Sequence, residues 1–460
     1  MFGKFGMLGA VAVAAVAADA ATITKQIVRQ QWPWQEKVRI DYVLDAAAGE
    51  QSDVVLKVTD PATDRDVTGL STAQSGDLEY VTAGEHVLYW TPDKAEFADG
   101  KIPPMLKFEL SAKAPIGKRY MIFDLDPEGL KTYDATRQIA VSYQDDPPEG
   151  GFNVADYKTK KIAFRRCRAG TYLMGSPETE PGRTWSNVKE TQHKVTLTRD
   201  FYLAIFPTTC AQSQYIWNQG GGGAFTWQNF YCTLSPVQAY RGKPGATTAW
   251  SSDETVDQES FIGMLRAHGV TGLPAGYVVD LPTEAQWEYA CRAGTTTAWN
   301  NGMDADYQPY VVEEKYIVYN PTAVKGTVVK NTYWDSNLDL LGHYKCRGGF
   351  WQQANPTGNN YPGGFQPNAW GFYDMHGGFK ELCLDTLVWG KSDDLGAKDA
   401  VDPRVTSSQA YNFVRGGSWL TDAQGCRSAA RTYIGLTSGH SNEVGVRLAV
   451  IPVPGVALGD

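Results

Sequence analysis

The chain has 460 residues, including 14 Trp, 24 Tyr and 17 Phe, which is enough aromatic material for the cores of two or three domains. A net charge of −9 lacks the basic surface that nucleic acids and anionic membranes require, so no nucleic-acid partner is expected. With 47 Gly and 24 Pro, the composition is typical of a loop-rich chain rather than a helical one.

The first 21 residues have the features of a secretory signal peptide. Lys4 precedes an Ala-rich apolar stretch from Phe5 to Val16, and small residues follow with the spacing of a cleavage site. This stretch is shorter than the roughly 20 residues of a membrane-spanning helix, although an uncleaved anchor remains the alternative. We expect residues 1–21 to be removed. The mature protein is then a secreted, periplasmic or cell-surface protein of bacterial type, not integral to the membrane.

Residues 22–143 show the alternation of half-buried strands. Val38, Ile40, Tyr42 and Leu44 alternate with polar or exposed positions. Similar stretches occur at 53–58, 85–91, 106–110, 120–125 and 137–143. Short strands separated by turns predict a β-sandwich domain of immunoglobulin-like type, without the Cys and Trp signature of true immunoglobulin domains.

A linker is predicted at residues 144–155. The segment QDDPPEGGFN is acidic, contains a Pro-Pro and a Gly-Gly pair, and has no apolar period. All seven cysteines lie beyond it. A second domain is therefore expected to begin near residue 156.

Four ordered motifs mark this second domain. They are AGTYLMGS at 169–176, LPTEAQWEYACRAG at 281–294, PNAWGFYDMHGG at 367–378, and RGGSW at 415–419 followed by CRSAAR at 426–431. In this order and spacing they resemble the formylglycine-generating (sulfatase-modifying factor) family. The resemblance implies a loop-rich α+β domain over residues 156–455, related to the C-type lectin fold. Within the second motif, Thr283 is placed to cap a helix that stops at Gly294.

The resemblance also implies copper-dependent oxidation of a cysteine, for which this chain lacks one of the two copper ligands. Active members of the family oxidise a substrate cysteine with copper(I) held by two thiolates five residues apart. The matching positions here are Thr421 and Cys426. A hydroxyl is a poor ligand for a soft ion, so copper is not expected to bind. Cys426 is left as the single candidate catalytic residue.

A structural disulfide between Cys291 and Cys426 is the second implication of the resemblance. It agrees with an oxidising compartment, in which cysteines usually pair. The alternative is a reactive thiol at Cys426. The odd number of cysteines leaves at least one without an intramolecular partner.

Calcium is the third group that the resemblance brings up. Where the family often reads Gly-Asn-Val-Trp-Glu-Trp, this chain has Gly-Gly-Phe-Lys-Glu-Leu at 377–382. The substitution removes the Asn oxygen and adds the ammonium of Lys380, which weakens a site for a hard cation. Glu381 remains as a candidate ligand, so calcium binding stays undecided at this point.

Trp419, Trp370 and Arg431 are candidates for a binding groove, with burial in the core as the alternative for each. Arg415, Arg431 and Arg447 occur where the family keeps arginines. We expect them to be buried and to donate hydrogen bonds to loop carbonyls.

The missing copper ligand favours a non-catalytic module that binds a peptide, a glycan or a partner protein. The alternative is an oxidoreductase-type enzyme of the same family, active in protein modification through Cys426 or through an unrecognised metal site. This alternative rests on analogy of fold alone.

Overall fold

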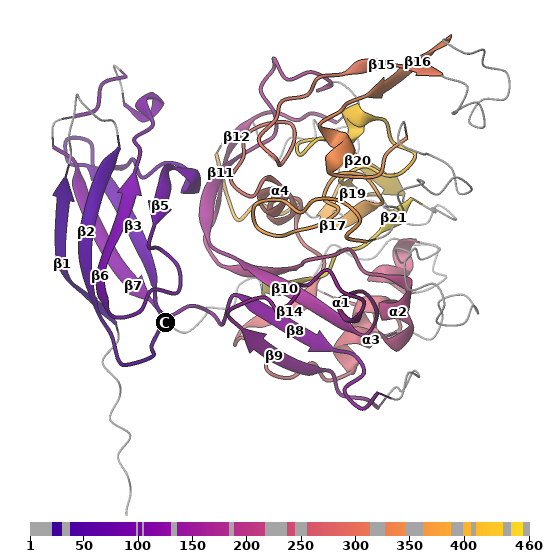
Figure 1. Ribbon diagram of the computed structural model, residues 1–460, viewed down its shortest axis with the longest axis horizontal. Coiled ribbons are helices and arrows are strands. Elements are labelled where there is room, and N and C mark those ends of the chain that lie inside the picture. Colours follow the sequence, from indigo (N-terminus) through magenta and orange to yellow (C-terminus); the bar gives the residue numbers. More distant parts are fainter. Residues whose placement is uncertain are drawn as a thin grey trace, which may run out of the picture. The chain divides into compact units, whose positions relative to one another are not determined.

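The computed structural model describes thirteen stretches of the chain (Figure 1). They are residues 21–29, 37–97, 100–103, 105–129, 136–183, 188–216, 237–243, 255–312, 327–345, 362–387, 399–405, 411–435 and 443–453. The chain forms two compact units. Residues up to 69 and 73–115 make the first unit, and residues 70–72 together with 116–460 make the second.

The first unit contains two antiparallel sheets around one core. One sheet has the order β1 (Thr22–Arg29), β2 (Val38–Asp45), β6 (Gly84–Trp90) and β5 (Gln74–Gly76), and the other β4 (Arg65–Asp66), β3 (Asp53–Asp60) and β7 (Lys107–Lys113). A short 3₁₀ turn occurs at η2 (Lys94–Glu96), and another, η1 (Ser71–Ala73), contains residues assigned to both units. Alternate residues of β2 are buried, and they share a core cluster with Val54 and Leu56 of β3. The predicted alternation is confirmed in these strands.

The domain boundary lies earlier than predicted. β8 (Tyr120–Asp124) pairs with β10 (Lys161–Cys167), and β9 (Ala140–Gln144) pairs with β8. Residues 116–143 therefore belong to the second unit, and the predicted division at 144–155 is wrong. The Pro-Pro and Gly-Gly pairs form a loop inside this unit, immediately before the short helix α1 (Asp156–Thr159).

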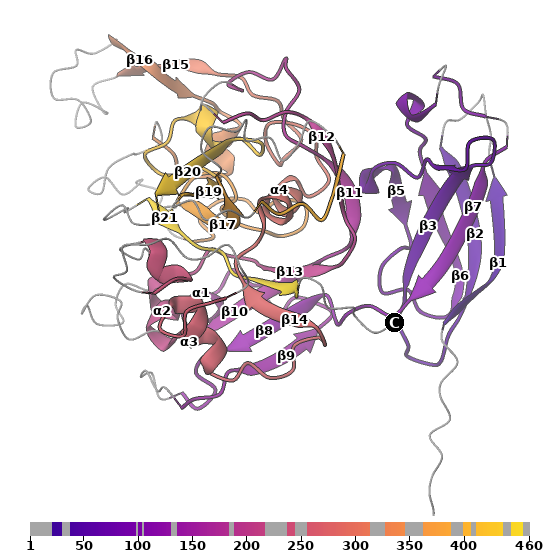
Figure 2. The ribbon, with the colours of Figure 1, turned by 180° about the vertical axis from the view of Figure 1, so that it is seen from behind.

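The second unit is rich in β-structure and has few helices (Figure 2). Its largest sheet has the order β14 (Tyr277–Asp280), β22 (Ala449–Pro452), β13 (Phe201–Ala204), β10, β8 and β9. A three-stranded sheet contains β11 (Gly170–Met174), β12 (His193–Leu197) and β18 (Ala400–Val401), and a four-stranded sheet contains β20 (Arg431–Gly435), β19 (Tyr411–Arg415), β17 (Lys380–Thr386) and β21 (Val444–Gly445). β15 (Gln308–Val312) and β16 (Thr327–Trp334) form a hairpin. The remaining helical elements are α2 (Cys210–Ile216), η3 (Val237–Tyr240), α3 (Phe261–Ala267), α4 (Glu284–Arg292), η5 (Leu338–Leu340) and η6 (Ala423–Cys426).

Helix α4 lies in the interior of the second unit. Thr283 caps it as predicted, and Gln286 completes a reciprocal capping box. The helix ends before Gly294, with Ala293 in the left-handed conformation. All nine of its residues are buried, including two glutamates and one arginine. Buried charges need partners, so the surroundings of α4 have to supply them.

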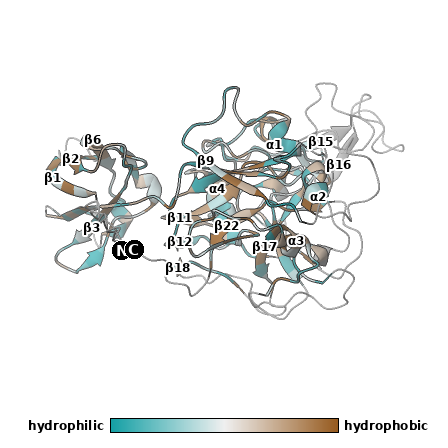
Figure 3. Cartoon of the chain, turned by 90° about the horizontal axis from the view of Figure 1, so that it is seen from below, coloured by the Kyte–Doolittle hydropathy of each residue, from teal (hydrophilic) through white to brown (hydrophobic). Residues whose placement is uncertain are grey.

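Apolar residues are spread through the sheets and helices rather than concentrated in one long helix (Figure 3). In the part of the chain that the structure describes, no helix combines the length and apolar character needed to cross a membrane. Residues 1–20 of the predicted signal peptide lie outside the described ranges.

Candidate functional site

The segment that follows β19 forms a tight turn at two glycines. Gly416 and Gly417 have φ values of 88° and 73°, which L side chains rarely adopt. A Cβ on Gly417 would lie 2.5 Å from the sulfur of Cys426. Glycine is therefore required for both conformation and space, and the turn is in van der Waals contact with the second copper-ligand position of the family.

Thr421, at the first ligand position, is part of a hydrogen-bonded network. Its side-chain oxygen accepts a hydrogen bond from the Ser418 backbone N–H at 2.9 Å and lies 2.9 Å from the Ser418 hydroxyl. The Ser418 hydroxyl donates to Glu443, which also accepts from the Lys380 ammonium at 3.0 Å. Thr421 is 4% exposed. The place of a soft thiolate is therefore taken by a buried, engaged hydroxyl, and this residue set does not suit copper(I).

Ser418 and Glu443 in this network are arranged like a nucleophile and its general base. Ser418 contacts the Glu443 carboxylate, which Lys380 in turn orients, and such an order of groups can activate a hydroxyl. However, Ser418 has no exposed surface. A substrate cannot reach its oxygen in this conformation, so the arrangement is structural.

No disulfide joins Cys291 to Cys426, and both side chains are buried thiols. The imidazole of His376 contacts both residues: its Nδ1 lies 2.7 Å from the Cys426 carbonyl oxygen, and its Nε2 lies 3.9 Å from the Cys291 sulfur. Burial raises the pKa of Cys291 to about 12 and lowers that of His376 to about 4. The predicted bridge is therefore wrong: the Cys291 sulfur is a thiol that lies against a neutral imidazole.

Cys426 lies in a small apolar cluster with Trp299, Leu338 and Tyr344. It has no exposed surface. A thiol in such surroundings behaves as a small apolar group and not as a nucleophile. The geometry gives no support to Cys426 as a catalytic residue.

Glu381 is engaged in an ion pair. Its two carboxylate oxygens accept hydrogen bonds from Arg447, each at 2.8 Å, and one also accepts from the Trp287 indole at 2.5 Å. The side chain is 1% exposed. This carboxylate neutralises an arginine, and the geometry gives no support to Glu381 as a calcium ligand. Within the described ranges, no three His, Cys, Asp or Glu side chains gather as a metal site would require.

Two of the three groove candidates are half-buried, and the third is in the interior. Trp370 packs edge-to-face against Tyr289, with ring centroids 5.0 Å apart, and Trp419 donates its backbone N–H to Gly378. Arg431 is buried and forms an ion pair with Glu284. The assignment of Arg431 to a groove is corrected, since a ligand cannot contact it.

The prediction of structural arginines is confirmed. Arg415 donates to the carbonyls of Ala429 and Ala430, at 3.0 and 2.7 Å. Arg447 donates to three backbone carbonyls, and Arg431 to one. Sequence reasoning missed the carboxylates Glu284 and Glu288 on α4, which pair with Arg431 and Arg415. Two glutamates spaced four residues apart in a helix that also carries Trp, Tyr and Cys were the available signal.

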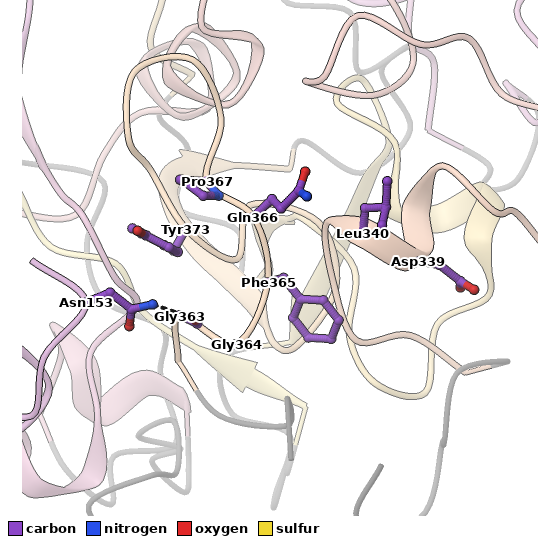
Figure 4. A pocket seen from close by; sticks show the side chains of 9 residues that line it. All are labelled: Asn153, Asp339, Leu340, Gly363, Gly364, Phe365, Gln366, Pro367 and Tyr373. Carbon is purple, nitrogen blue, oxygen red and sulfur yellow. Dashed lines mark hydrogen bonds between the residues drawn. The ribbon is translucent and has the colours of Figure 1, made fainter. Parts of the chain in front are cut away.

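A surface pocket of about 430 Å³ was also missed (Figure 4). Residues 363–367 run between Asn153 and Tyr373 on one side and Asp339 and Leu340 on the other. Tyr373 belongs to the PNAWGFYDMHGG motif, which contributed only to the family resemblance. The volume of the pocket lies within the range of small-ligand sites.

Asp374, next to this pocket, should make stability depend on pH. One of its oxygens accepts from Gly363 N–H at 2.6 Å, and burial raises its pKa to about 7. Because the folded-state pKa exceeds the unfolded value, the stabilisation is complete at low pH and is lost as the pH rises through 7. Between pH 8 and 6 this group should add about 1.4 kcal/mol of stability.

The variant Asp374→Asn keeps an acceptor for Gly363 and removes the titration. Urea unfolding at pH 6 and 8 should show that the free energy of unfolding rises less between pH 8 and pH 6 in the variant than in the wild type, by about 1.4 kcal/mol. Asp385, whose pKa burial raises to about 6, should keep its own contribution in both proteins. An unchanged pH dependence in the variant would contradict the assignment.

Comparison with known proteins places this geometry in a family. The model of the "Sulfatase-modifying factor enzyme 1-like domain" matches residues 158–451. Formylglycine-generating enzymes of Thermomonospora curvata and Streptomyces coelicolor are 26% identical over 166 and 164 residues. Each match covers 33% of this chain, and they cover 43% and 40% of the two enzymes, so the chain spans less than half the length of these relatives.

Two solved structures are also similar. PvdO from Pseudomonas aeruginosa is 19% identical and Treponema denticola variable protein 1 is 15% identical, both with a TM-score of 0.38. Each alignment covers 63% of this chain, and they cover 94% and 95% of the two structures. The family model spans more than half of the chain and contains all four sequence motifs. The chain therefore belongs to the family of the sulfatase-modifying factor enzyme 1-like domain.

Proposed function

We propose that this protein is an exported, non-catalytic member of the family, which recognises a peptide, a glycan or a partner protein. The observation that carries the proposal is the state of Thr421: its hydroxyl is buried and hydrogen-bonded to Ser418 at the first copper-ligand position. The burial of Cys426 adds support, because the remaining thiol is shielded from substrate. The alternative is an enzyme that acts through Cys426 or through an unrecognised metal site, and among the described residues no observation favours it.

The proposal extends to the architecture and location of the chain. The two sheets of the first unit agree with an immunoglobulin-like sandwich, and the loop-rich second unit agrees with a relative of the C-type lectin fold. The amino-terminal segment supports export. A β-sandwich joined to a recognition domain suits a role at the cell surface or in the periplasm.

The direct test is an assay for formylglycine. The purified chain, supplied with copper(I) and a sulfatase-type peptide, should leave the peptide cysteine unoxidised, as mass spectrometry would report. The physical reason is that one thiolate and one hydroxyl do not provide the soft two-sulfur coordination of copper(I). Formation of formylglycine, with contaminating enzyme excluded, would overturn the non-catalytic assignment.

Replacement of Thr421 by Cys tests the same reasoning in the opposite direction. Because Cys426 is a thiol in the structure, Thr421→Cys should raise copper(I) affinity by at least about tenfold. Competition with a chromophoric copper(I) chelator would measure the change. The matched control Thr421→Ser keeps a hydroxyl and should bind copper(I) no better than the wild type. Equal affinity in all three proteins would count against Thr421 as the determining position.

A further inference from the structure

The surface pocket of Figure 4 combines oriented polar groups with apolar walls. We propose that it binds an uncharged, hydroxyl-rich ligand, namely a terminal sugar unit of a glycan. This inference rests on the proposed recognition role and gives that role a ligand class. The pocket lies entirely within the second unit, and all of its lining residues belong to the described ranges.

Hydrogen bonds hold two polar side chains of the pocket in place. Asp339 accepts from the Tyr344 hydroxyl at 2.8 Å and from the Trp334 indole at 3.2 Å. Asn153 donates to the Gly363 carbonyl and accepts from Lys158, both at 2.8 Å. These bonds fix the orientation of a carboxylate and an amide at the pocket wall. A ligand seated against them has to be polar itself, because covering such groups with an apolar surface is costly.

Residues 363–367 supply a second kind of polar group. Gln366 is exposed, and its side-chain amide makes no hydrogen bond to another described residue. A primary amide offers donors and acceptors side by side. Adjacent hydroxyls of a sugar do the same, so they can pair with the amide in either direction. Gly364 has no side chain, which lets a ligand approach the backbone closely.

The apolar groups of the pocket match the face of a sugar ring that carries C–H groups. Leu340 is 50% exposed at the rim, and Pro367 is also exposed. Tyr373 is held by stacking on Phe206, with centroids 4.8 Å apart. Rigid rings and aliphatic side chains of this kind pack against C–H groups, and a wholly polar ligand would leave them without a partner.

The charge of the lining narrows the choice of ligand. None of the lining residues is Lys, Arg or His, and Asp339 is a carboxylate. An anionic ligand would face this carboxylate with no cation among the lining residues, and the Lys158 ammonium behind the lining set already donates to Asn153. A purely apolar ligand would remove the waters of Asp339, Asn153 and Gln366 without replacing their hydrogen bonds. A neutral polyol carries no charge to be repelled by Asp339, and its hydroxyls can replace the hydrogen bonds of the displaced water.

The test uses the full chain and saturation-transfer NMR. The probes are the methyl glycosides of glucose, mannose, galactose and N-acetylglucosamine, with a neutral capped peptide (acetyl-Gly-Pro-Leu-Gly-amide) and n-butylammonium as comparisons. At least one glycoside should bind with a dissociation constant below about 10 mM, and Gln366→Ala should weaken it by about tenfold. Leu340→Asp should also weaken it. Gln308→Ala, an exposed glutamine outside the pocket, should leave it unchanged.

Three results would overturn the proposal: no glycoside binds, only the peptide or the amine binds, or Gln366→Ala leaves glycoside binding intact. The formylglycine assay separates this failure from that of the proposed function. Without glycoside binding and without formylglycine, the recognition role stands and the sugar class falls. If formylglycine forms, the recognition role falls whatever the pocket binds.

Discussion

A chain that begins at residue 116 should fold, whereas a chain that begins at residue 156 should not unfold cooperatively at all. The shorter fragment lacks β8 and β9 and leaves one side of β10 unpaired, although it contains the whole range of the family match. Far-UV circular dichroism and thermal unfolding of residues 116–460 and 156–460 would measure the difference.

The expected effect is large because the missing strands carry core side chains. Met121, Phe123, Leu125 and Ile139 are at most 3% exposed and pack with Phe164 in the main core. Burying each is worth about 1.5–3 kcal/mol, and together they approach the total stability of a typical domain, about 5–15 kcal/mol. Equal melting temperatures for the two fragments would show that the boundary lies near residue 150 after all.

Removal of the Arg415 guanidinium should destabilise the protein by about 3–5 kcal/mol, the usual cost of breaking a buried ion pair from one side. Arg415 has no exposed side-chain surface and contacts the Glu288 carboxylate. Burial acts to raise the pKa of Glu288, but the charges of Arg292 and Arg415 outweigh it, so the pKa lies below its usual range. In Arg415→Met, the charge of Arg415 no longer compensates Glu288, and the three backbone carbonyls that accept from Arg415 lose a donor.

Two controls make the Arg415 result specific. Lys118→Met breaks an exposed pair with Asp145 and should change the free energy of unfolding little. Arg415→Lys keeps the charge but loses the planar fork, so its stability should fall between those of the wild type and Arg415→Met. Urea unfolding would measure all three variants. If Arg415→Met cost no more than Lys118→Met, the buried cluster would not be a stabilising centre of the domain.

Local pattern predicted the strands well and their domain poorly. The stretches 120–125 and 137–143 are strands close to the predicted positions, at Tyr120–Asp124 and Ala140–Gln144. Alternation reports that one face of a strand is buried, but not which sheet it joins. The Pro-Pro and Gly-Gly segment lies between β8 and β10 in the sequence. Its composition is equally typical of a loop within a domain and of a linker between domains, so it could not show that the two strands pair.

The site shows a similar limit. Position 421 could be identified from motif spacing, and the carbonyl-bonding arginines followed from the family pattern. The environment of Cys426 did not, because His376, which contacts the Cys426 carbonyl and the Cys291 sulfur, comes from a segment 50 residues away. The pocket at residues 363–367 combines three separate parts of the chain, and no local signal joins them.

The Arg-Gly-Gly-Ser segment separates ancestry from activity. Arg415 holds the central helix through Glu288, and Gly416 and Gly417 form the turn through their own backbone conformation. The side chain at position 421 contacts this segment at Ser418, where a hydroxyl serves as the acceptor. During evolution, the metal-binding residue at position 421 can therefore be substituted while the Arg-Gly-Gly-Ser segment, by which relatives are recognised, is retained. A match to this segment traces descent, and the residue six positions after the arginine has to be read separately before an activity is inherited by analogy.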